Sequence, residues 1–307
     1  TPAAAELELR RLSPSYRVFF GAGDIVDVPA DLEATFALFD TFEPDGGRTL
    51  RRYLDQAAIQ YDVAMREVVY RDFTRLRDFF SRRMMTEGRK LSVFTNLDRY
   101  VRTYFESDRA RKVLEYSMVF LGGAPYNTPA LYNIMSHVDL VMGVWYPMGG
   151  IAAVVASMQR LAEAAGARFL FDRPVTRIVV EGGRTGAVET DAGRIAADVV
   201  VADADYHHVE TALLEPRHRQ YSDRYWATRV IAPSAFVLYL GLDRPVAGLA
   251  HHSLFLHHDW MDHFNKIFQH PGWPDEPSIY VCATSKTDPS VAPPGTENLF
   301  VLVPVAA

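Results

Sequence analysis

One carboxylate is placed where it could do acid–base chemistry: Asp288, in the tetrapeptide Thr287-Asp-Pro-Ser290. A carboxylate held in a fixed position can take a proton from a reacting carbon or supply one. The other interpretation is an ordinary turn, because an Asp followed by Pro commonly begins one. The residues alone leave both interpretations open.

A group of histidines lies near this segment, and it consists of His251, His252, His257, His258 and His263. In an extended strand His251 and His257 would lie on one face, an arrangement that metal sites use. No acidic or thiolate residue is regularly spaced with them. We therefore expect hydrogen-bonded or solvent-exposed histidines and no metal site. Cys282, the single cysteine, is expected to be a small buried residue of a strand.

Composition limits the classes of protein to which the chain can belong. It has 307 residues, 49% of them hydrophobic, with 32 Lys and Arg against 38 Asp and Glu. The apolar content excludes a disordered chain, and the net charge of −6 provides no global basic field, so no nucleic-acid partner is expected. No signal peptide, membrane-spanning stretch or disulfide pair is recognisable. The expected location is the cytoplasm, or the cytoplasmic membrane surface through peripheral contact.

Local patterns predict the elements of the first half. Residues 16–20 and 24–28 flank a Gly-containing turn and predict a β-hairpin. Asp31 should cap a helix over 32–39, because its carboxylate can accept free backbone N–H groups. Apolar residues at steps of three and four between 50 and 80 predict a long helical region, which we expect to contain a break.

The end of that helical region is basic. Its arginines include Arg75, Arg77, Arg82 and Arg83. With aromatic and Met side chains on the other face, such a helix could lie on an anionic membrane surface. The alternative is a solvated charged face above an ordinary core face.

The rest of the chain alternates between helices, turns and strands. Helices are expected over 107–120, 129–142 and 151–165, and a turn-rich connector over 143–150. Expected strands are 167–171, 175–180, 185–190, 194–202, 235–241, 253–256, 278–282 and 299–303. The apolar run 199–202 is typical of a strand buried on both faces of a nucleotide-binding sheet. The last four strands are expected to form one sheet.

Several blocks resemble the bacterial-type phytoene desaturases, FAD-dependent carotenoid desaturases within the amine-oxidase-like flavoproteins. The most specific are Gly143-Val-Trp-Tyr-Pro-Met-Gly-Gly150 and Thr287-Asp-Pro-Ser-Val-Ala-Pro293. Weaker blocks follow in the same order: Leu12-Ser-Pro-Ser-Tyr-Arg17, Gly122-Gly-Ala-Pro-Tyr126, 166–178, Ala197-Asp-Val-Val-Val-Ala-Asp203 and Leu249-Ala-His-His-Ser253. Together they cover nearly all of the chain.

The resemblance implies an α/β fold combined with an α+β part. A partial Rossmann-type layer of an FAD domain, residues 143–205, would join a substrate domain of mixed or antiparallel sheet and helices, residues 1–142 and 206–307. The Gly-x-Gly-x-x-Gly segment that opens the family is absent. We therefore expect the chain to be the middle of a longer protein. FAD is implied for the complete family member, and weak or no FAD binding is expected here.

The resemblance also implies roles for individual residues. Pro147, Gly149 and Gly150 would form a turn beside the flavin, and Val175 would present its backbone to the adenine. For such a reaction Asp288 is the candidate for a base that takes a proton or stabilises a carbocation, beside the turn interpretation given above. Aromatic residues Tyr126, Tyr146 and Trp145 would line a polyene channel, although aromatic residues also simply fill cores.

The function implied is desaturation of an apolar carotenoid precursor such as phytoene, with hydride passing from an allylic C–H bond to flavin. Two alternatives stay open. One is a related carotenoid isomerase, ketolase or saturase. The other is a cofactor-free protein that binds carotenoids or other apolar lipids. The oligomeric state is not predicted.

Overall fold

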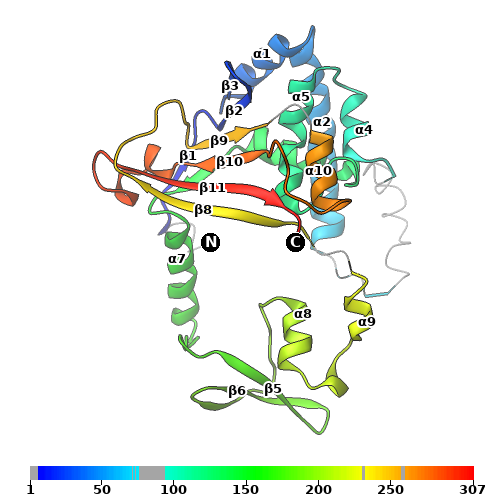
Figure 1. Cartoon of the computed structure of the whole chain (residues 1–307), viewed down its shortest axis with the longest axis vertical. Coiled ribbons are helices and arrows are strands. Elements are labelled where there is room, and N and C mark those ends of the chain that lie inside the picture. The colour runs from blue at the N-terminus through cyan, green and yellow to red at the C-terminus, as the bar shows by residue number, and fades with distance from the viewer. Residues whose placement is uncertain (1–5, 71, 73, 76–93, 230–231, 257–259) are drawn as a thin grey trace. The chain divides into compact units, whose positions relative to one another are not determined.

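The structure is a computed structural model that describes residues 6–70, 72, 74–75, 94–229, 232–256 and 260–307. The chain divides into two compact units (Figure 1). The first comprises Thr1–Ser157 and Ala232–Ala307, and the second comprises Met158–Ile231. The domain boundaries expected at 142 and 205 stay a prediction.

A six-stranded sheet organises the first unit, in the order β3-β2-β9-β10-β11-β8. Its strands are β2 (Tyr16–Gly21), β3 (Asp24–Val28), β8 (Ser234–Leu242), β9 (His252–Phe255), β10 (Ile279–Cys282) and β11 (Glu297–Val305). Neighbouring strands are antiparallel except for β2 and β9, which are parallel. The predicted hairpin and the predicted sheet of four late strands are both confirmed, and β2 joins them into one sheet.

Two helices pack together beside the hairpin. Helix α1 (Leu32–Phe42) begins at Asp31, whose Oδ1 accepts the amide of Ala34 at 2.8 Å, as the sequence predicted. Helix α2 (Gly46–Ala64) crosses close to it, and a Cβ on Gly46 would overlap the carbonyl of Phe39. Only glycine permits that approach.

The predicted break in the long helical region is confirmed. Helix α2 ends at Ala64 and continues as one π-helical turn, Met65–Val69. Arg75 lies in a bend after it, whereas Arg77, Arg82 and Arg83 lie outside the described residues. Within the described part of the chain, no helix has both the length and the apolar character needed to cross a membrane.

The remaining helices of this unit cover one face of the sheet. They are α4 (Leu97–Arg102), α5 (Asp108–Glu115) with a 3₁₀ turn (Tyr116–Leu121), α6 (Ile134–Ser136) between a 3₁₀ turn (Ala130–Asn133) and a π-helical turn (His137–Met142), and α10 (Trp260–Phe268). Ser107 caps α5 as predicted. The core contains fully buried Tyr16, Val18, Phe39, Leu50 and Tyr53. Burying side chains of this size supplies most of the stabilising free energy.

The connector that follows pairs with the start of the chain. Strand β4 (Trp145–Pro147) lies antiparallel to β1 (Leu9–Arg11), so that Leu9 faces Pro147. Gly149 and Gly150 follow, both with positive φ, +85° and +80°. Helix α7 (Ile151–Ala164) begins directly after them.

The second unit contains a three-stranded antiparallel sheet. Its strands are β5 (Val175–Glu181), β6 (Arg184–Thr190) and β7 (Gly193–Ala196), followed by short helices α8 (Tyr206–His208) and α9 (Asp223–Trp226). The predicted hairpins in this region are confirmed.

Two strands predicted in the second unit do not form. Residues 167–171 and 199–202 are irregular, and the side chains of Val199 and Val201 are 75% and 89% exposed. The prediction of a buried strand over 199–202 was therefore wrong for this structure. A strand needs neighbours for its backbone hydrogen bonds, and none of the described strands pairs with these segments.

Candidate functional site: an apolar pocket and the turn held by Asp288

A pocket of about 430 Å³ lies between the six-stranded sheet and the helical layer of the first unit. That volume falls within the ordinary range for small-molecule sites. Its lining residues are Tyr16, Tyr116, Ser117, Phe120, Leu121, Met135, Val144, His252, Leu254, Tyr280, Phe300 and Leu302. Apart from Ser117, the tyrosine hydroxyls and the His252 ring, these side chains present carbon to the cavity.

Strand register places the sheet side of this lining. Tyr280 faces Leu254 on one neighbour and Leu302 on the other, so all three side chains lie on the same face of the sheet. The helical side contributes Phe120, whose ring lies edge-on to that of Tyr280 at 5.5 Å between centroids. The walls are thus rigid aromatic and aliphatic groups held by regular structure.

The half-buried carboxylate of Asp139 accepts hydrogen bonds from the hydroxyl groups of two tyrosines that line the pocket. Tyr16 donates its O–H to Asp139 Oδ2 at 2.8 Å, and Tyr116 donates to the same oxygen at 3.3 Å. Burial raises the pKa of Asp139 to about 6, although the two tyrosine hydrogen bonds act in the opposite direction. Because both hydroxyls are engaged, this wall of the pocket offers little polarity to a ligand. Asp139 was not predicted from the sequence, although an acidic residue in the apolar stretch 130–142 is a signal that could have identified it.

Asp288 lies in the loop after β10, beside β4 and the turn that follows β4. Its side chain is only 1% exposed, and its carboxylate accepts four hydrogen bonds. Oδ1 accepts the amide and hydroxyl of Ser290 at 2.9 and 2.6 Å, while Oδ2 accepts the Gly149 amide at 2.6 Å and the Tyr146 hydroxyl at 3.5 Å. The carboxylate thereby holds together two segments that are far apart in sequence.

These hydrogen bonds decide what Asp288 can do in this arrangement. The hydrogen bond from Ser290 has the largest effect and the one from Gly149 the next largest, and both lower the pKa of Asp288. A carboxylate with a lowered pKa and four donors is a weak base. The geometry therefore favours the turn interpretation, in which Asp288 positions the Gly149 turn, and its role as a base stays a prediction.

The predicted flavin-contacting turn adjoins Asp288. Pro147 is buried in β4, Gly149 is exposed, and the ring of Trp145 is 51% exposed. The amide of Gly149 donates to Asp288, and that of Gly150 donates to the carbonyl of Pro147, so neither is available to a phosphate.

The remaining predicted contact, Val175, begins β5 in the second unit and is partly exposed. The turn 145–150 fits one requirement of a flavin site, since it combines a half-exposed Trp145 with two residues that have no side chain. With the chain lacking Gly-x-Gly-x-x-Gly, these residues do not fit the pyrophosphate. The cofactor contacts of Pro147, Gly149, Gly150 and Val175 stay predictions.

The aromatic residues predicted to line a channel lie elsewhere. Tyr126 packs edge-on against Phe264 at 5.9 Å, and Tyr146 is buried against His251 at 4.7 Å between ring centroids. Neither of them, nor Trp145, lines the pocket. Spacing along the chain could not identify the Tyr and Phe residues that do, because they come from four separate segments.

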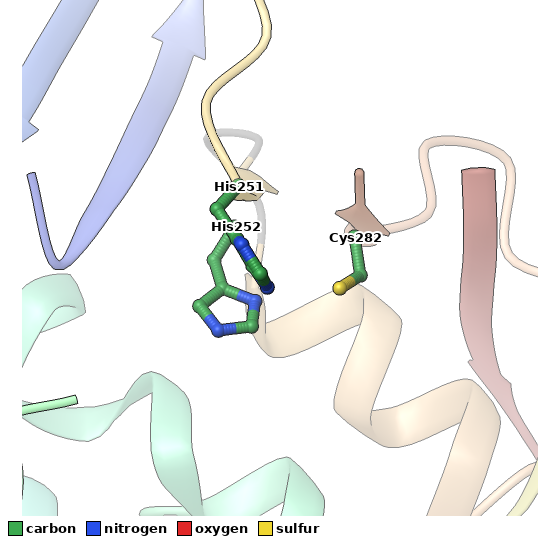
Figure 2. Close-up of side chains that lie close together, drawn as sticks. All are labelled: His251, His252 and Cys282. Carbon is green, nitrogen blue, oxygen red and sulfur yellow. The ribbon is translucent and has the colours of Figure 1, made fainter. Parts of the chain in front are cut away.

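The histidines separate in the structure. His263 is buried, and both of its ring nitrogens lie 3.2 Å from backbone partners, the carbonyl of Pro304 and the amide of Ser278. His257 and His258 lie outside the described residues. His251 and His252 lie beside Cys282 (Figure 2).

Comparisons with known proteins agree with the motifs. The profile of the family "Flavin containing amine oxidoreductase" matches residues 4–307. A carotenoid 3,4-desaturase of Haloarcula japonica is 43% identical over 97% of this chain and 61% of its own length. A zeta-carotene-forming phytoene desaturase of Myxococcus xanthus is 33% identical over 97% of this chain and 57% of its own length. The chain thus spans about three fifths of the curated relatives it matches.

Solved structures support the fold. A crystal structure of an oxidoreductase from Methanosarcina mazei superposes with a TM-score of 0.54 at 15% identity, covering 98% of this chain and 62% of the other. A protein from Pyrococcus furiosus gives a TM-score of 0.56 at 14% identity, covering 97% and 60%. The predicted α/β class and the resemblance to carotenoid desaturases are both confirmed. The chain belongs to the family of flavin-containing amine oxidoreductases.

Proposed function

We propose that this chain forms the polyene-binding part of a flavin-dependent carotenoid desaturase. The relatives named above are carotenoid and phytoene desaturases, and their similarity extends over nearly all of this chain. The observation that carries the proposal is the apolar pocket in the first unit, with its aromatic walls and engaged tyrosine hydroxyls.

Desaturation forms a C=C bond by removing a hydride from one carbon and a proton from its neighbour. In the complete protein, a bound flavin would supply the acceptor for the hydride and its two electrons. The residues of this chain would bind and orient the chain of carbons and exclude water from it. A polyene offers no strong hydrogen-bonding group, so shape and apolar contact must hold it. The pocket lining meets that requirement.

A binding experiment tests the pocket. Leu302→Trp adds bulk on the pocket face of β11, while Leu299→Trp adds the same side chain to the same strand on the opposite face. Transfer of a carotenoid from detergent micelles to the purified chain would be followed by its absorption spectrum. We expect at least tenfold weaker binding for Leu302→Trp and little change for Leu299→Trp. Equal binding by both folded variants would refute the pocket assignment.

Flavin content separates the proposal from the cofactor-free alternative. The protein to be tested is a longer form of this chain, extended to the length of its relatives. We expect this form to keep the yellow absorbance of bound flavin through gel filtration. A colourless extended form that still binds carotenoid would favour a binding protein instead. Product analysis with the same form would separate a desaturase from an isomerase, ketolase or saturase.

We also propose that the protein acts in the cytoplasm at a membrane surface, where an apolar polyene dissolves. The basic cluster of Arg75, Arg77, Arg82 and Arg83 would contact anionic lipid. Changing these four residues to Glu should abolish flotation with anionic vesicles. Changing the exposed Arg48 and Arg52 of α2 to Glu should leave flotation intact. Unchanged flotation of the first variant would refute the contact.

A further inference from the structure

A cluster of soft and borderline metal ligands lies at the ends of two neighbouring strands. Cys282 ends β10 and is paired in register with His252, which begins β9, so their side chains share one face of the sheet. His251 precedes the strand in a bend, which frees its side chain from the alternation of a strand. One ligand atom from each of the three residues lies within 4.8 Å of the others. Figure 2 shows a nitrogen of each ring and the sulfur turned toward one another.

The buried ring of His251 has an unused nitrogen. This residue is 5% exposed, and its Nδ1 lies 2.7 Å from Thr287 Oγ1, which fixes the ring. Nε2 is buried with no hydrogen-bond partner among the described residues. A buried polar atom without a partner costs free energy, and native structures rarely leave one unexplained. A cation bound at Nε2 would supply the missing interaction.

Neighbouring hydroxyl groups hold the rings of both histidines in place. Thr287 and Tyr280, whose hydroxyl lies 2.7 Å from His252 Nδ1, orient the two rings as outer-shell partners commonly do.

We propose that His251, His252 and Cys282 bind a single thiophilic cation, with Zn²⁺ as the ion that fits best. Two imidazoles and one thiolate are a zinc-type ligand set, and solvent would complete a tetrahedral site. In such a site neighbouring ligand atoms are about 3–4 Å apart, from bond lengths of about 2.0–2.3 Å. The observed spacing therefore requires side-chain adjustments of about 1 Å. Cys282 would lose its proton to solvent on binding.

A metal site was not expected from the sequence, because no acidic or thiolate residue is regularly spaced with the histidines. Sheet pairing supplies that thiolate from a segment thirty residues further along. No other residues of the described part of the chain form such a group of three His, Cys, Asp or Glu side chains.

The single cysteine makes the site testable by thiol chemistry, because every alkylation event reports on Cys282. The purified chain, stripped with a chelator, would be treated with iodoacetamide with and without equimolar Zn²⁺. We expect Zn²⁺ to slow alkylation at least tenfold and Mg²⁺ to have no effect. An alkylation rate unchanged by Zn²⁺ would overturn the proposal.

Spectroscopy with Co²⁺ identifies the ligands. The wild-type chain should bind one Co²⁺ with a thiolate-to-cobalt charge-transfer band, which Zn²⁺ displaces. Cys282→Ser keeps the side-chain shape and should lose the band, and His251→Gln should bind at least tenfold more weakly. His270→Ala removes an exposed histidine of α10's neighbouring loop and should bind as the wild type does. Binding unchanged in folded Cys282→Ser would overturn the assignment, and unfolding profiles establish that each variant is folded.

Discussion

The half-buried Asp139 should reduce the stability of the folded chain at neutral pH, and Asp139→Asn tests this. Burial raises its pKa from 3.8 to about 6. One pKa unit corresponds to about 1.4 kcal/mol, so the ionised carboxylate costs at most about 3 kcal/mol of unfolding free energy. Because the folded pKa is the higher one, this cost is absent below pH 3.8, grows between pH 3.8 and 6, and is complete above pH 6.

The Asp139→Asn variant keeps a side-chain oxygen that can accept the hydrogen bonds of Tyr16 and Tyr116, but it removes the negative charge. Losing the charge weakens those two hydrogen bonds by an amount of about 1 kcal/mol. The net expectation at pH 8 is that Asp139→Asn is more stable than the wild type by about 1–2 kcal/mol. At pH 4 the advantage should vanish or reverse.

Urea unfolding followed by tryptophan fluorescence, at intervals from pH 4 to pH 8, measures the difference between the two proteins. Subtracting the unfolding free energy of the wild type from that of the variant at each pH cancels the contribution of the other titrating groups. Tyr16→Phe with Tyr116→Phe is the matched control. It removes the bonds that lower the pKa of Asp139, and so it should move the wild-type pH dependence to higher pH. A difference between Asp139→Asn and wild type that stays constant across this pH range would refute the reasoning.

Three further predictions follow from burial and hydrogen bonding. Asp288→Ala removes a carboxylate that accepts four hydrogen bonds, so it should lower the unfolding free energy by about 2–4 kcal/mol. Urea unfolding at pH 7 measures this change, and an effect under about 0.5 kcal/mol would contradict the positioning role. Phe39→Ala leaves a cavity at a fully buried site and should cost about 3–5 kcal/mol in the same assay. Val201→Asp alters a largely exposed side chain and should change the melting temperature of this chain by no more than about 2 °C, whereas clear destabilisation would show that 199–202 is buried after all.

Local chemistry explains the parts of the fold that could be predicted. The hairpin over Tyr16–Gly21 and Asp24–Val28 depends on residues within one short segment, and so does the cap at Asp31. The break after Ala64 followed from the length of the apolar pattern. In each case every determinant lies within a few turns or one hairpin of chain, where spacing is informative.

Contacts between distant segments explain what could not be predicted. The parallel pairing of β2 with β9 joins residues more than two hundred positions apart, and the bond from Gly149 to Asp288 joins residues 139 apart. Spacing carries no information on such pairs. The resemblance to desaturases named both Gly149 and Asp288, yet their contact and its donors became visible only in the structure.

The failed prediction over 199–202 has a different cause. The apolar run is typical of a strand buried on both faces of a sheet. Such a pattern indicates the environment in which the segment would be stable, namely between two neighbouring strands and under covering layers. Within the described residues those surroundings are missing, so the valines stay exposed and the backbone unpaired. A hydrophobic pattern thus predicts a preference, while strand formation also needs partners for the backbone.

The alternation of side chains in β9 and β10 connects the pocket with the cluster beside it. On the helix-covered face, β9 presents His252 and then Leu254, and β10 presents Tyr280 and then Cys282. Leu254 and Tyr280 line the pocket, while His252 both lines the pocket and lies beside Cys282. A slip of β9 by one residue against β10 would turn His252 and Leu254 to the other face of the sheet and leave Tyr280 and Cys282 where they are. The pocket would then lose two lining side chains, and the cluster would lose His252, so both features depend on the same register.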